Sequence, residues 1–217
     1  MPCMITAHAG ALGTKDNTLD SLKTCLDFFN GSGCVEVDVR FDAAGAPILT
    51  HDAPKPGENP PLLSEFFTLL QDYSTRVNLD LKSTANLPEV ERLAEAYGVL
   101  PQVFFTGVIS DWVEAVKSGA PKIPYYINWS LAGDETSSRE TLLALAEEII
   151  ALGGIGLNTR WQNASEEMTE IMHRNGLLLS VWTANEEPDM RRMLFIGVDN
   201  ITTRKPDLLR DIMSAAN

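Results

Sequence analysis

Short apolar runs alternate along the whole chain with longer stretches that are apolar on one side and polar on the other. The short runs are typical of β-strands, and the longer stretches have the spacing of amphipathic helices. We predict strands over residues 4–7, 35–41, 47–50, 76–82, 102–106, 122–129, 154–158, 177–183 and 200–202. We predict helices over residues 18–29, 62–73, 88–97, 110–118, 138–152, 166–175, 188–195 and 206–214. Asn17 and Thr18 supply the cap signal of the first helix.

These elements form eight strand–helix units with one short extra strand, an order that predicts a parallel sheet covered by helices. Eight units in one α/β domain of 217 residues favour a closed (β/α)₈ TIM barrel without a large inserted subdomain. The alternative is an open doubly wound sheet, which usually has a glycine-rich phosphate loop after its first strand. Here His8, Ala9 and Gly10 follow that strand, and the chain has no G-x-G-x-x-G motif. No linker divides the chain, so we predict a single domain over residues 1–217.

The strand predicted over residues 35–41 carries charge on one face. Side chains alternate along a strand, so its three valines share one face while Glu36, Asp38 and Arg40 share the other. Glu36 and Asp38 then lie roughly 6.5–7 Å apart along the backbone. Unpaired charge in a buried strand is expensive. The simplest interpretation is that these two acids hold a cation.

The strand predicted over residues 76–82 repeats this pattern, with Asp80 and Lys82 on its polar face. Neighbouring strands would bring Glu36, Asp38 and Asp80 to one point, where a divalent cation would relieve their repulsion. Ligands that are all oxygen favour Mg²⁺ or Ca²⁺ over zinc. The alternative is an internal ion-pair network, with Arg40 on Glu36 and Lys82 on Asp80.

Two histidines fall at predicted strand ends close to these acids. His8 follows the first strand, and His51 follows the short extra strand. Barrel enzymes carry their chemistry at the carboxyl ends of the strands, and an acid–base pair needs groups that titrate near neutral pH. Trp182, near the end of another strand, is interpreted as an apolar wall for a small organic group or as packing of the barrel end. His173 lies within a predicted helix and is interpreted as structural.

Composition narrows the classes of partner. The net charge of −13 argues against binding to nucleic acid and against stable association with an anionic membrane. A phosphate substrate stays compatible, since a bound metal reverses the local field. The sequence has no apolar run as long as a membrane span and no signal-peptide pattern, so we expect a cytoplasmic protein. The three cysteines are interpreted as buried thiols.

In combination, these residues resemble the glycerophosphodiester phosphodiesterase family over the whole chain, most specifically in the first fifty residues. That family opens with a strand into His-Arg-Gly and then Glu-Asn-Thr, followed by Glu-x-Asp, His-Asp, Glu-x-Lys and Trp-Thr-x-Asn. The matching segments here are Ile5-Thr6-Ala7-His8-Ala9-Gly10, Asp16-Asn17-Thr18, Glu36-Val37-Asp38, His51-Asp52, Asp80-Leu81-Lys82, Trp182-Thr183-Ala184-Asn185, Gly197-Val198-Asp199-Asn200-Ile201-Thr202 and Pro206-Asp207.

The resemblance implies a barrel enzyme of glycerol and lipid metabolism that hydrolyses small glycerophosphodiesters to glycerol 3-phosphate and an alcohol. It implies one divalent metal ion, Mg²⁺ or Ca²⁺, on Glu36, Asp38 and Asp80. The metal would bind a phosphate oxygen, activate the nucleophile and neutralise charge as the bond breaks. The remaining implied roles are acid–base catalysis for His8 and His51, a phosphate contact for Lys82, and a wall of the glycerol pocket for Trp182.

Three departures from the family pattern bear on the substrate. Ala9 stands where the family has an arginine that binds phosphate, which removes one donor fork. Arg40 and Lys82 are the candidates to replace it. Asp80 stands where glutamate is usual and is shorter by one methylene. The segment after His51 is short, whereas many relatives carry an inserted helical subdomain there.

Two other functions stay open. The loss of the arginine at Ala9 is also compatible with a phospholipase D-like enzyme that acts on lysophospholipids or on sphingomyelin-type lipids. The other hypothesis is a non-catalytic barrel that binds a phosphorylated ligand. Retention of both histidines and of all three acids favours an enzyme over a binding module.

Overall fold

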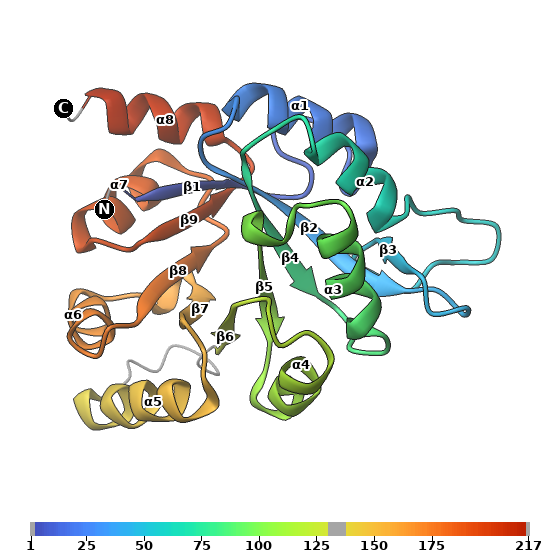
Figure 1. The fold of residues 1–217 in the computed structure, drawn as a ribbon. Coiled ribbons are helices and arrows are strands. Elements are labelled where there is room, and N and C mark those ends of the chain that lie inside the picture. The colour runs from blue at the N-terminus through green and yellow to red at the C-terminus, as the bar shows by residue number, and fades with distance from the viewer. Residues whose placement is uncertain (1–2, 130–137, 216–217) are drawn as a thin grey trace.

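Eight parallel strands close into a barrel in the computed structural model of this chain, which describes residues 3–129 and 138–215 (Figure 1). The ring runs in the order β1-β9-β8-β7-β6-β5-β4-β2, and β1 pairs with β2 to close it. The strands are β1 (Met4–Ala7), β2 (Cys34–Phe41), β4 (Arg76–Leu81), β5 (Val103–Val108), β6 (Tyr125–Asn128), β7 (Gly156–Arg160), β8 (Leu178–Trp182) and β9 (Asn200–Thr203). The predicted TIM barrel is confirmed.

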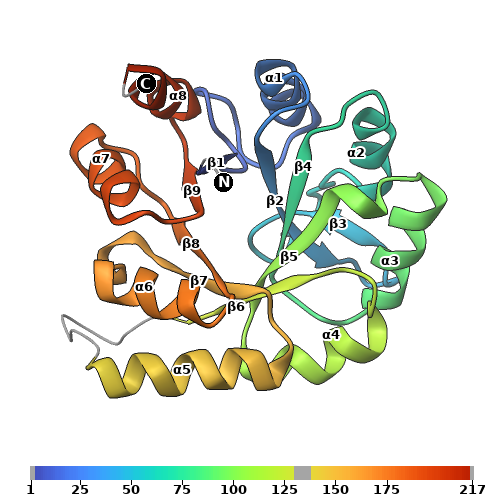
Figure 2. The same ribbon diagram turned by 60° about the vertical axis from the view of Figure 1, so that its left-hand side comes forward.

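Helices surround the barrel on its outside (Figure 2). They are α1 (Leu19–Phe29), α2 (Leu63–Leu70), α3 (Leu87–Ala96), α4 (Val113–Gly119), α5 (Arg139–Leu152), α6 (Glu166–Arg174), α7 (Glu187–Ile196) and α8 (Pro206–Ala215). In α1 the buried apolar residues recur at the spacing of one helix face, with Leu22, Leu26 and Phe29 against the barrel. Thr18 caps this helix, since its side chain accepts a hydrogen bond from the Ser21 backbone N–H at 3.2 Å.

Strand β2 shows the alternation that positions the site. Val35, Val37 and Val39 are fully buried in the core that the barrel shares with the helices. Burying each of these side chains contributes about 1.5–3 kcal/mol. The intervening side chains therefore point into the barrel, where Glu36 and Asp38 lie. In the register of β2 with β4, Asp38 is paired with Asp80, so the acids of the two strands come to the same level.

A small apolar cluster fills the end of the barrel at which the strands begin. Cys34, Phe104 and Tyr126 form it, and all three lie at the amino ends of their strands. The Phe104 and Tyr126 ring centroids are 5.7 Å apart. This packing closes the amino end of the barrel and leaves the carboxyl end available for a site.

The chain departs from the predicted boundaries in two informative places. The strand predicted over residues 122–129 begins only at Tyr125, because Pro124 has no N–H for the ladder. Its carbonyl still accepts a hydrogen bond from Phe105 at 2.8 Å. The extra strand β3 (Pro47–Leu49) pairs antiparallel with β2, outside the ring, and ends before His51. His51 is thus carried by the segment that follows β3.

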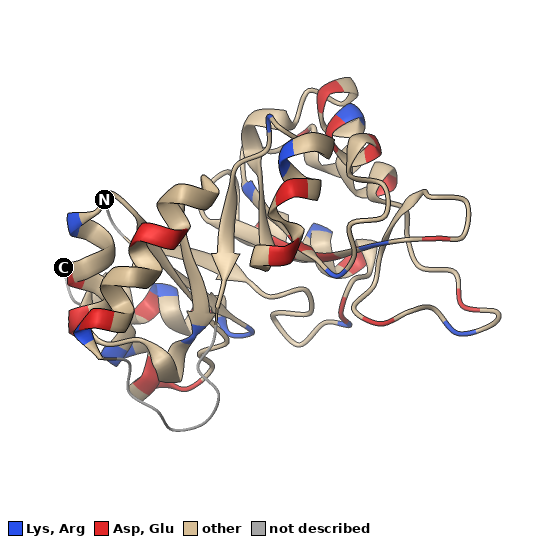
Figure 3. Cartoon of the chain, turned by 90° about the horizontal axis from the view of Figure 1, so that it is seen from below, with Lys and Arg blue, Asp and Glu red and all other residues tan. Residues whose placement is uncertain are grey.

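Acidic and basic residues are interspersed over the helices (Figure 3). Several form ion pairs within one helix, such as Lys23 with Asp27 and Arg191 with Glu187, each at 2.8 Å. Such exposed pairs contribute little to stability. Within residues 3–129 and 138–215, no helix combines the length and the apolar character of a membrane span.

Candidate active site

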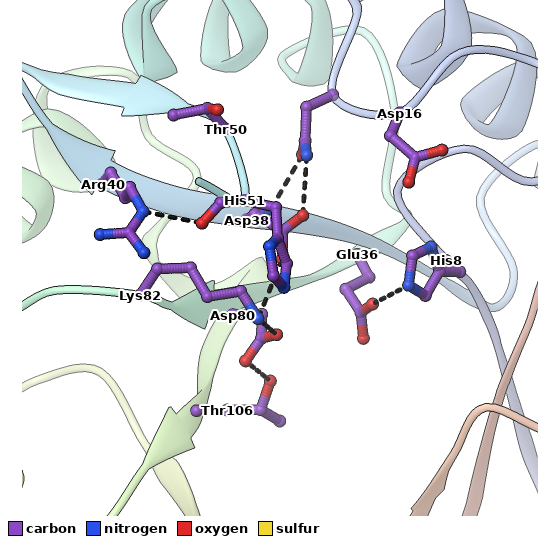
Figure 4. Close-up of polar contacts among 12 residues, drawn as sticks. His8, Asp16, Glu36, Asp38, Arg40, Thr50, His51, Asp80, Lys82 and Thr106 are labelled. Carbon is purple, nitrogen blue, oxygen red and sulfur yellow. Dashed lines mark hydrogen bonds and ion pairs between the residues drawn. The ribbon is translucent and has the colours of Figure 1, made fainter. Parts of the chain in front are cut away.

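The carboxyl ends of the barrel strands surround a cavity of about 320 Å³. Its lining includes all five predicted catalytic and metal-binding residues and two of the three predicted substrate contacts, namely His8, His51, Glu36, Asp38, Asp80, Lys82 and Trp182. Arg40, the third predicted contact, does not line this cavity. Residues that lie far apart in the sequence thus meet in one small space (Figure 4).

Glu36 is one of the buried acids of the cavity. Asn78, its partner in the register with β4, donates a hydrogen bond to Oε2 at 2.9 Å. The other oxygen, Oε1, faces His8 Nε2 at 3.8 Å. Burial, reinforced by the charges of Asp80 and Asp38, raises the pKa of Glu36 well above its usual value. The Glu36 carboxylate therefore has too little positive charge near it to stabilise its ionised form.

Asp38 is held by Asn17, a residue that the sequence analysis placed in a helix cap and in the Asp16-Asn17-Thr18 segment without a role at Asp38. The Asn17 side chain donates from Nδ2 to Asp38 Oδ2 at 2.7 Å. In return, its Oδ1 accepts the Asp38 backbone N–H at 3.0 Å. Asn17 is buried and has a left-handed backbone, with φ of 57°, which asparagine tolerates better than most residues. No periodic pattern predicts this role.

Lys82 lies between two of the acids. Its Nζ is 2.5 Å from Asp80 Oδ2 and 3.2 Å from Asp38 Oδ1. The side chain is 21% exposed, and the charges of Asp80 and Asp38 outweigh burial, so its pKa is raised. Burial, together with the charge of Asp38, raises the pKa of Asp80 in spite of this ammonium. The predicted pair of Lys82 with Asp80 exists, whereas Arg40 does not pair with Glu36.

Gly107 makes room for the Asp80 carboxylate. A Cβ on Gly107 would lie 2.6 Å from Asp80 Oδ1 and 2.3 Å from the Leu81 carbonyl oxygen. Gly107 also has φ of 76°, a conformation that side chains rarely adopt. Thr106, the preceding residue, donates to Asp80 Oδ1 at 3.0 Å. The end of β5 is thus shaped around this acid.

His8 and His51 differ in their surroundings. His8 is largely buried, and burial followed by the charge of Arg204 lowers its pKa. Its Nδ1 is buried with no hydrogen-bond partner in the described part of the chain. The His51 side chain is 66% exposed, and its Nδ1 lies 2.9 Å from Asp52 Oδ1. Arg40 donates from Nε to the His51 carbonyl at 2.7 Å, which fixes the backbone that carries this histidine.

Trp182 forms one wall at the end of β8. The Arg160 guanidinium lies 5.7 Å from the centre of its ring, within cation–π range. The indole Nε1 is buried without a hydrogen-bond partner among the described residues. His173 stands apart from the site, with Nε2 2.8 Å from Asp199 Oδ2. Its predicted structural role agrees with this placement.

A second cavity, of about 550 Å³, adjoins the first and shares His51. Two loops line it, one at residues 15–18 and the other at residues 49–61. Its surface is mixed, with Lys15 and Lys55 beside Pro60 and Pro61. The segment after β3 therefore forms a pocket wall even though it is short.

The oxygen donors suit a hard divalent ion, because three carboxylates face a site with one ammonium among them. The raised pKa values of Glu36 and Asp80 express this shortage of positive charge. In the described residues, however, no three Asp, Glu, His or Cys side chains are arranged to hold a metal ion. Lys82 separates Asp38 from Asp80, so a metal on these acids would require the ammonium to move.

A family model described as the glycerophosphoryl diester phosphodiesterase family matches residues 54–208. A glycerophosphodiester phosphodiesterase from Caldanaerobacter subterraneus subsp. tengcongensis is 22% identical over 98% of both chains. A glycerophosphodiester phosphodiesterase structure from Parabacteroides distasonis has a TM-score of 0.78 at 19% identity, over 99% of this chain and 98% of that one. An Oleispira antarctica phosphodiesterase, solved with the product sn-glycerol-3-phosphate, has a TM-score of 0.76 at 19% identity, over 97% and 96%.

Proposed function

Since this chain belongs to the glycerophosphoryl diester phosphodiesterase family and is a phosphodiesterase, we propose that it cleaves small glycerophosphodiesters by metal-assisted acid–base catalysis. The products would be glycerol 3-phosphate and an alcohol. One observation carries the proposal: two histidines, three carboxylates and a lysine line a single cavity of about 320 Å³. Such a constellation suits hydrolysis of a phosphate diester better than binding alone.

Glu36, Asp38 and Asp80 are the residues that would hold one Mg²⁺ or Ca²⁺ ion. When bound, such an ion polarises a phosphate oxygen and lowers the pKa of the attacking hydroxyl. Lys82 would turn from the carboxylates toward the phosphate and bind one of its oxygens. Its flexible stem and its exposure to the cavity support this movement.

We assign the general base to His8. Burial favours the neutral form of this imidazole, which can accept a proton. The proton would come from a water that attacks phosphorus directly, or from the glycerol 2-hydroxyl, whose attack would expel the alcohol and leave a cyclic phosphate that a water then opens to glycerol 3-phosphate. His8 and Glu36 approach each other at 3.8 Å, so the base would lie beside the metal-binding oxygens. Proton transfer and charge neutralisation would then occur at the same end of the substrate.

We assign the general acid to His51, which would protonate the departing alcohol oxygen. His51 Nδ1 is hydrogen-bonded to Asp52, so Nε2 is the nitrogen that would face the substrate. His51 belongs to both cavities, so the alcohol would leave toward the larger one. Arg40 would position His51 through its carbonyl, and Trp182 would pack against the glycerol.

Hydrolysis of glycerophosphocholine in the presence of Mg²⁺ or Ca²⁺ tests the proposal. A chelator and His8→Ala should each reduce turnover by at least about 10²-fold. His173→Ala is the matched control and should keep the activity, since this histidine lies outside the cavity and pairs with Asp199. Activity that survives both the chelator and His8→Ala would contradict the mechanism. Faster turnover of a lysophospholipid than of glycerophosphocholine would favour the phospholipase D-like alternative.

A further inference from the structure

The cavity offers little positive charge to a phosphate. Lys82 is paired with Asp38 and Asp80 unless a metal takes these acids, and a lysine offers a point charge without a bidentate fork. Arg40 donates to the His51 carbonyl and does not line the cavity. At position 9, next to His8, the residue is a buried alanine. A metal on the acids and a released Lys82 would supply point charges, so a bidentate guanidinium for the phosphate would still be lacking.

Closure of the barrel brings Arg204 to the carboxyl end of the ring, next to the loop that carries His8, although Arg204 is not among the residues that line the cavity. Arg204 directly follows β9, the strand that pairs with β1. The carbonyl of the preceding residue, Thr203, accepts the His8 backbone N–H at 2.9 Å. The Arg204 carbonyl accepts the Leu12 N–H at 3.0 Å, and its own N–H donates to Asn185 Oδ1 at 2.8 Å. Its backbone is therefore fastened beside His8 on both sides.

Asp16 orients the Arg204 guanidinium from one side. Nη1 is 2.8 Å from Asp16 Oδ1 and Nη2 is 2.7 Å from Oδ2, a bidentate pair. Nη1 also approaches the Gly10 carbonyl at 3.4 Å. A Cβ on Gly10 would lie 1.9 Å from Asp16 Oδ1, so glycine is needed for this carboxylate to pack against the loop. Figure 4 shows Asp16 on the same side of the site as His8.

This pair leaves half of the guanidinium for a ligand. An arginine has five N–H donors. The two donors of Nη1 point to Asp16 and to the Gly10 carbonyl, and one donor of Nη2 bonds to Asp16. The edge formed by Nε and the second Nη2 hydrogen donates to no residue in the described part of the chain. The side chain is 41% exposed. Such an edge matches two oxygens of a phosphate.

The charge of Arg204 also acts within the cavity. It is the second-largest cause, after burial, of the lowered pKa of His8. The charges of Glu36 and Asp38 act on Arg204 in turn. These mutual effects agree with the contacts that fasten Arg204 next to the histidine.

We propose that Arg204 binds the substrate phosphate through its Nε–Nη2 edge and supplies the guanidinium that position 9 lacks. The proposal rests on the proposed phosphodiesterase function. Arg204 would act in binding, with Asp16 as the residue that orients it. The Arg204–Asp16 ion pair, which contacts the His8–Gly10 loop, would hold the guanidinium in place before the substrate binds.

Calorimetric titration with sn-glycerol 3-phosphate at saturating Mg²⁺ tests the proposal. Arg204→Met should weaken binding by about tenfold or more, because a charged bidentate contact contributes about 1.5–3 kcal/mol. KM for glycerophosphocholine should rise by a similar factor, with a smaller change in kcat. Arg191→Met is the matched control, since Arg191 also pairs with one carboxylate but lies on the surface of α7. It should leave the affinity within about twofold.

Asp16→Asn separates phosphate binding from a structural role of the ion pair. This variant breaks the same ion pair but keeps the guanidinium. The loss of affinity for glycerol 3-phosphate should therefore be at least fivefold smaller than in Arg204→Met. Equal losses in the two variants, or a loss under about threefold in Arg204→Met, would overturn the proposal. If Arg204→Met does not fold, Arg204→Lys keeps the charge without the fork and should still lose about threefold or more.

The two proposals fail in different ways. If the wild-type protein binds glycerol 3-phosphate but hydrolyses no glycerophosphodiester, the phosphodiesterase assignment fails while the comparison of Arg204→Met with Asp16→Asn still decides the binding role. If hydrolysis is intact in Arg204→Met with an unchanged KM, only the role of Arg204 is refuted.

Discussion

Asn17 offers the sharpest test of how the site is held. It joins the loop after β1 to Asp38 on β2 through two hydrogen bonds, at 2.7 and 3.0 Å. One bond goes to a carboxylate and the other comes from a buried backbone N–H. The residue also has a left-handed backbone, with φ of 57°. Asn17→Ala removes both bonds and forces alanine into this conformation.

The expected loss of unfolding free energy follows from these three terms. A hydrogen bond to a charged group contributes about 1.5–3 kcal/mol, and a buried donor left unsatisfied costs about 1–3 kcal/mol. Alanine in the left-handed region adds roughly 1–2 kcal/mol. Water from the adjoining cavity would solvate part of the freed groups. We therefore expect Asn17→Ala to destabilise the protein by about 3–5 kcal/mol.

Urea unfolding, followed by circular dichroism, measures this loss. Asn17→Gly removes the same bonds without backbone strain and should be about 0.5–1 kcal/mol less destabilising than Asn17→Ala. Asn59→Ala, at an exposed loop position, should change the free energy by at most about 0.5 kcal/mol. A loss below about 1 kcal/mol in Asn17→Ala would refute the reasoning, since it would show that neither bond supports Asp38.

Three further outcomes follow from the site. Without divalent ions, the wild-type unfolding free energy should fall as pH rises above the usual pKa of a glutamate, because the raised pKa of Glu36 gives stability that is complete at low pH and lost when the folded protein's Glu36 ionises. Glu36→Gln should flatten this pH dependence. An unchanged slope in Glu36→Gln would contradict the assignment to Glu36. Lys82→Met should strengthen Ca²⁺ binding about tenfold in calorimetry, because the ammonium competes for Asp38 and Asp80; weaker binding would show that it does not. His51→Ala should lower kcat about 10²–10⁴-fold yet keep the affinity for glycerol 3-phosphate, whereas a loss confined to affinity would remove its role as the acid.

Much of the fold was predictable because it depends on local alternation. A period of two puts Glu36 and Asp38 on the face opposite the valines of β2, whatever the strand later pairs with. The order of strands and helices then leaves few topologies, and the closed barrel is one of them. Boundaries were less predictable at β6, where Pro124 delays the strand, and after β3, which ends before His51.

The membership of the site was predictable only in part. Seven site residues were identified from their positions on predicted strands or directly after them, and all seven line one cavity: His8, Glu36, Asp38, His51, Asp80, Lys82 and Trp182. Arg40 was identified as a substrate contact, yet its guanidinium holds the His51 backbone instead of lining the cavity. The direction of a long flexible side chain depends on its neighbours in space, which the sequence pattern does not specify.

Which residues share a face follows from the sequence alone, since it depends on geometry that repeats from one residue to the next. Which faces meet depends on the tertiary structure. The register of β2 with β4 brings Lys82 between Asp80 and Asp38. The pairing of β1 with β9 brings Arg204 beside His8 and Asp16, although 188 residues separate Arg204 from Asp16. Contacts of this kind arise from strand register and ring closure, which depend on the packing of the whole barrel.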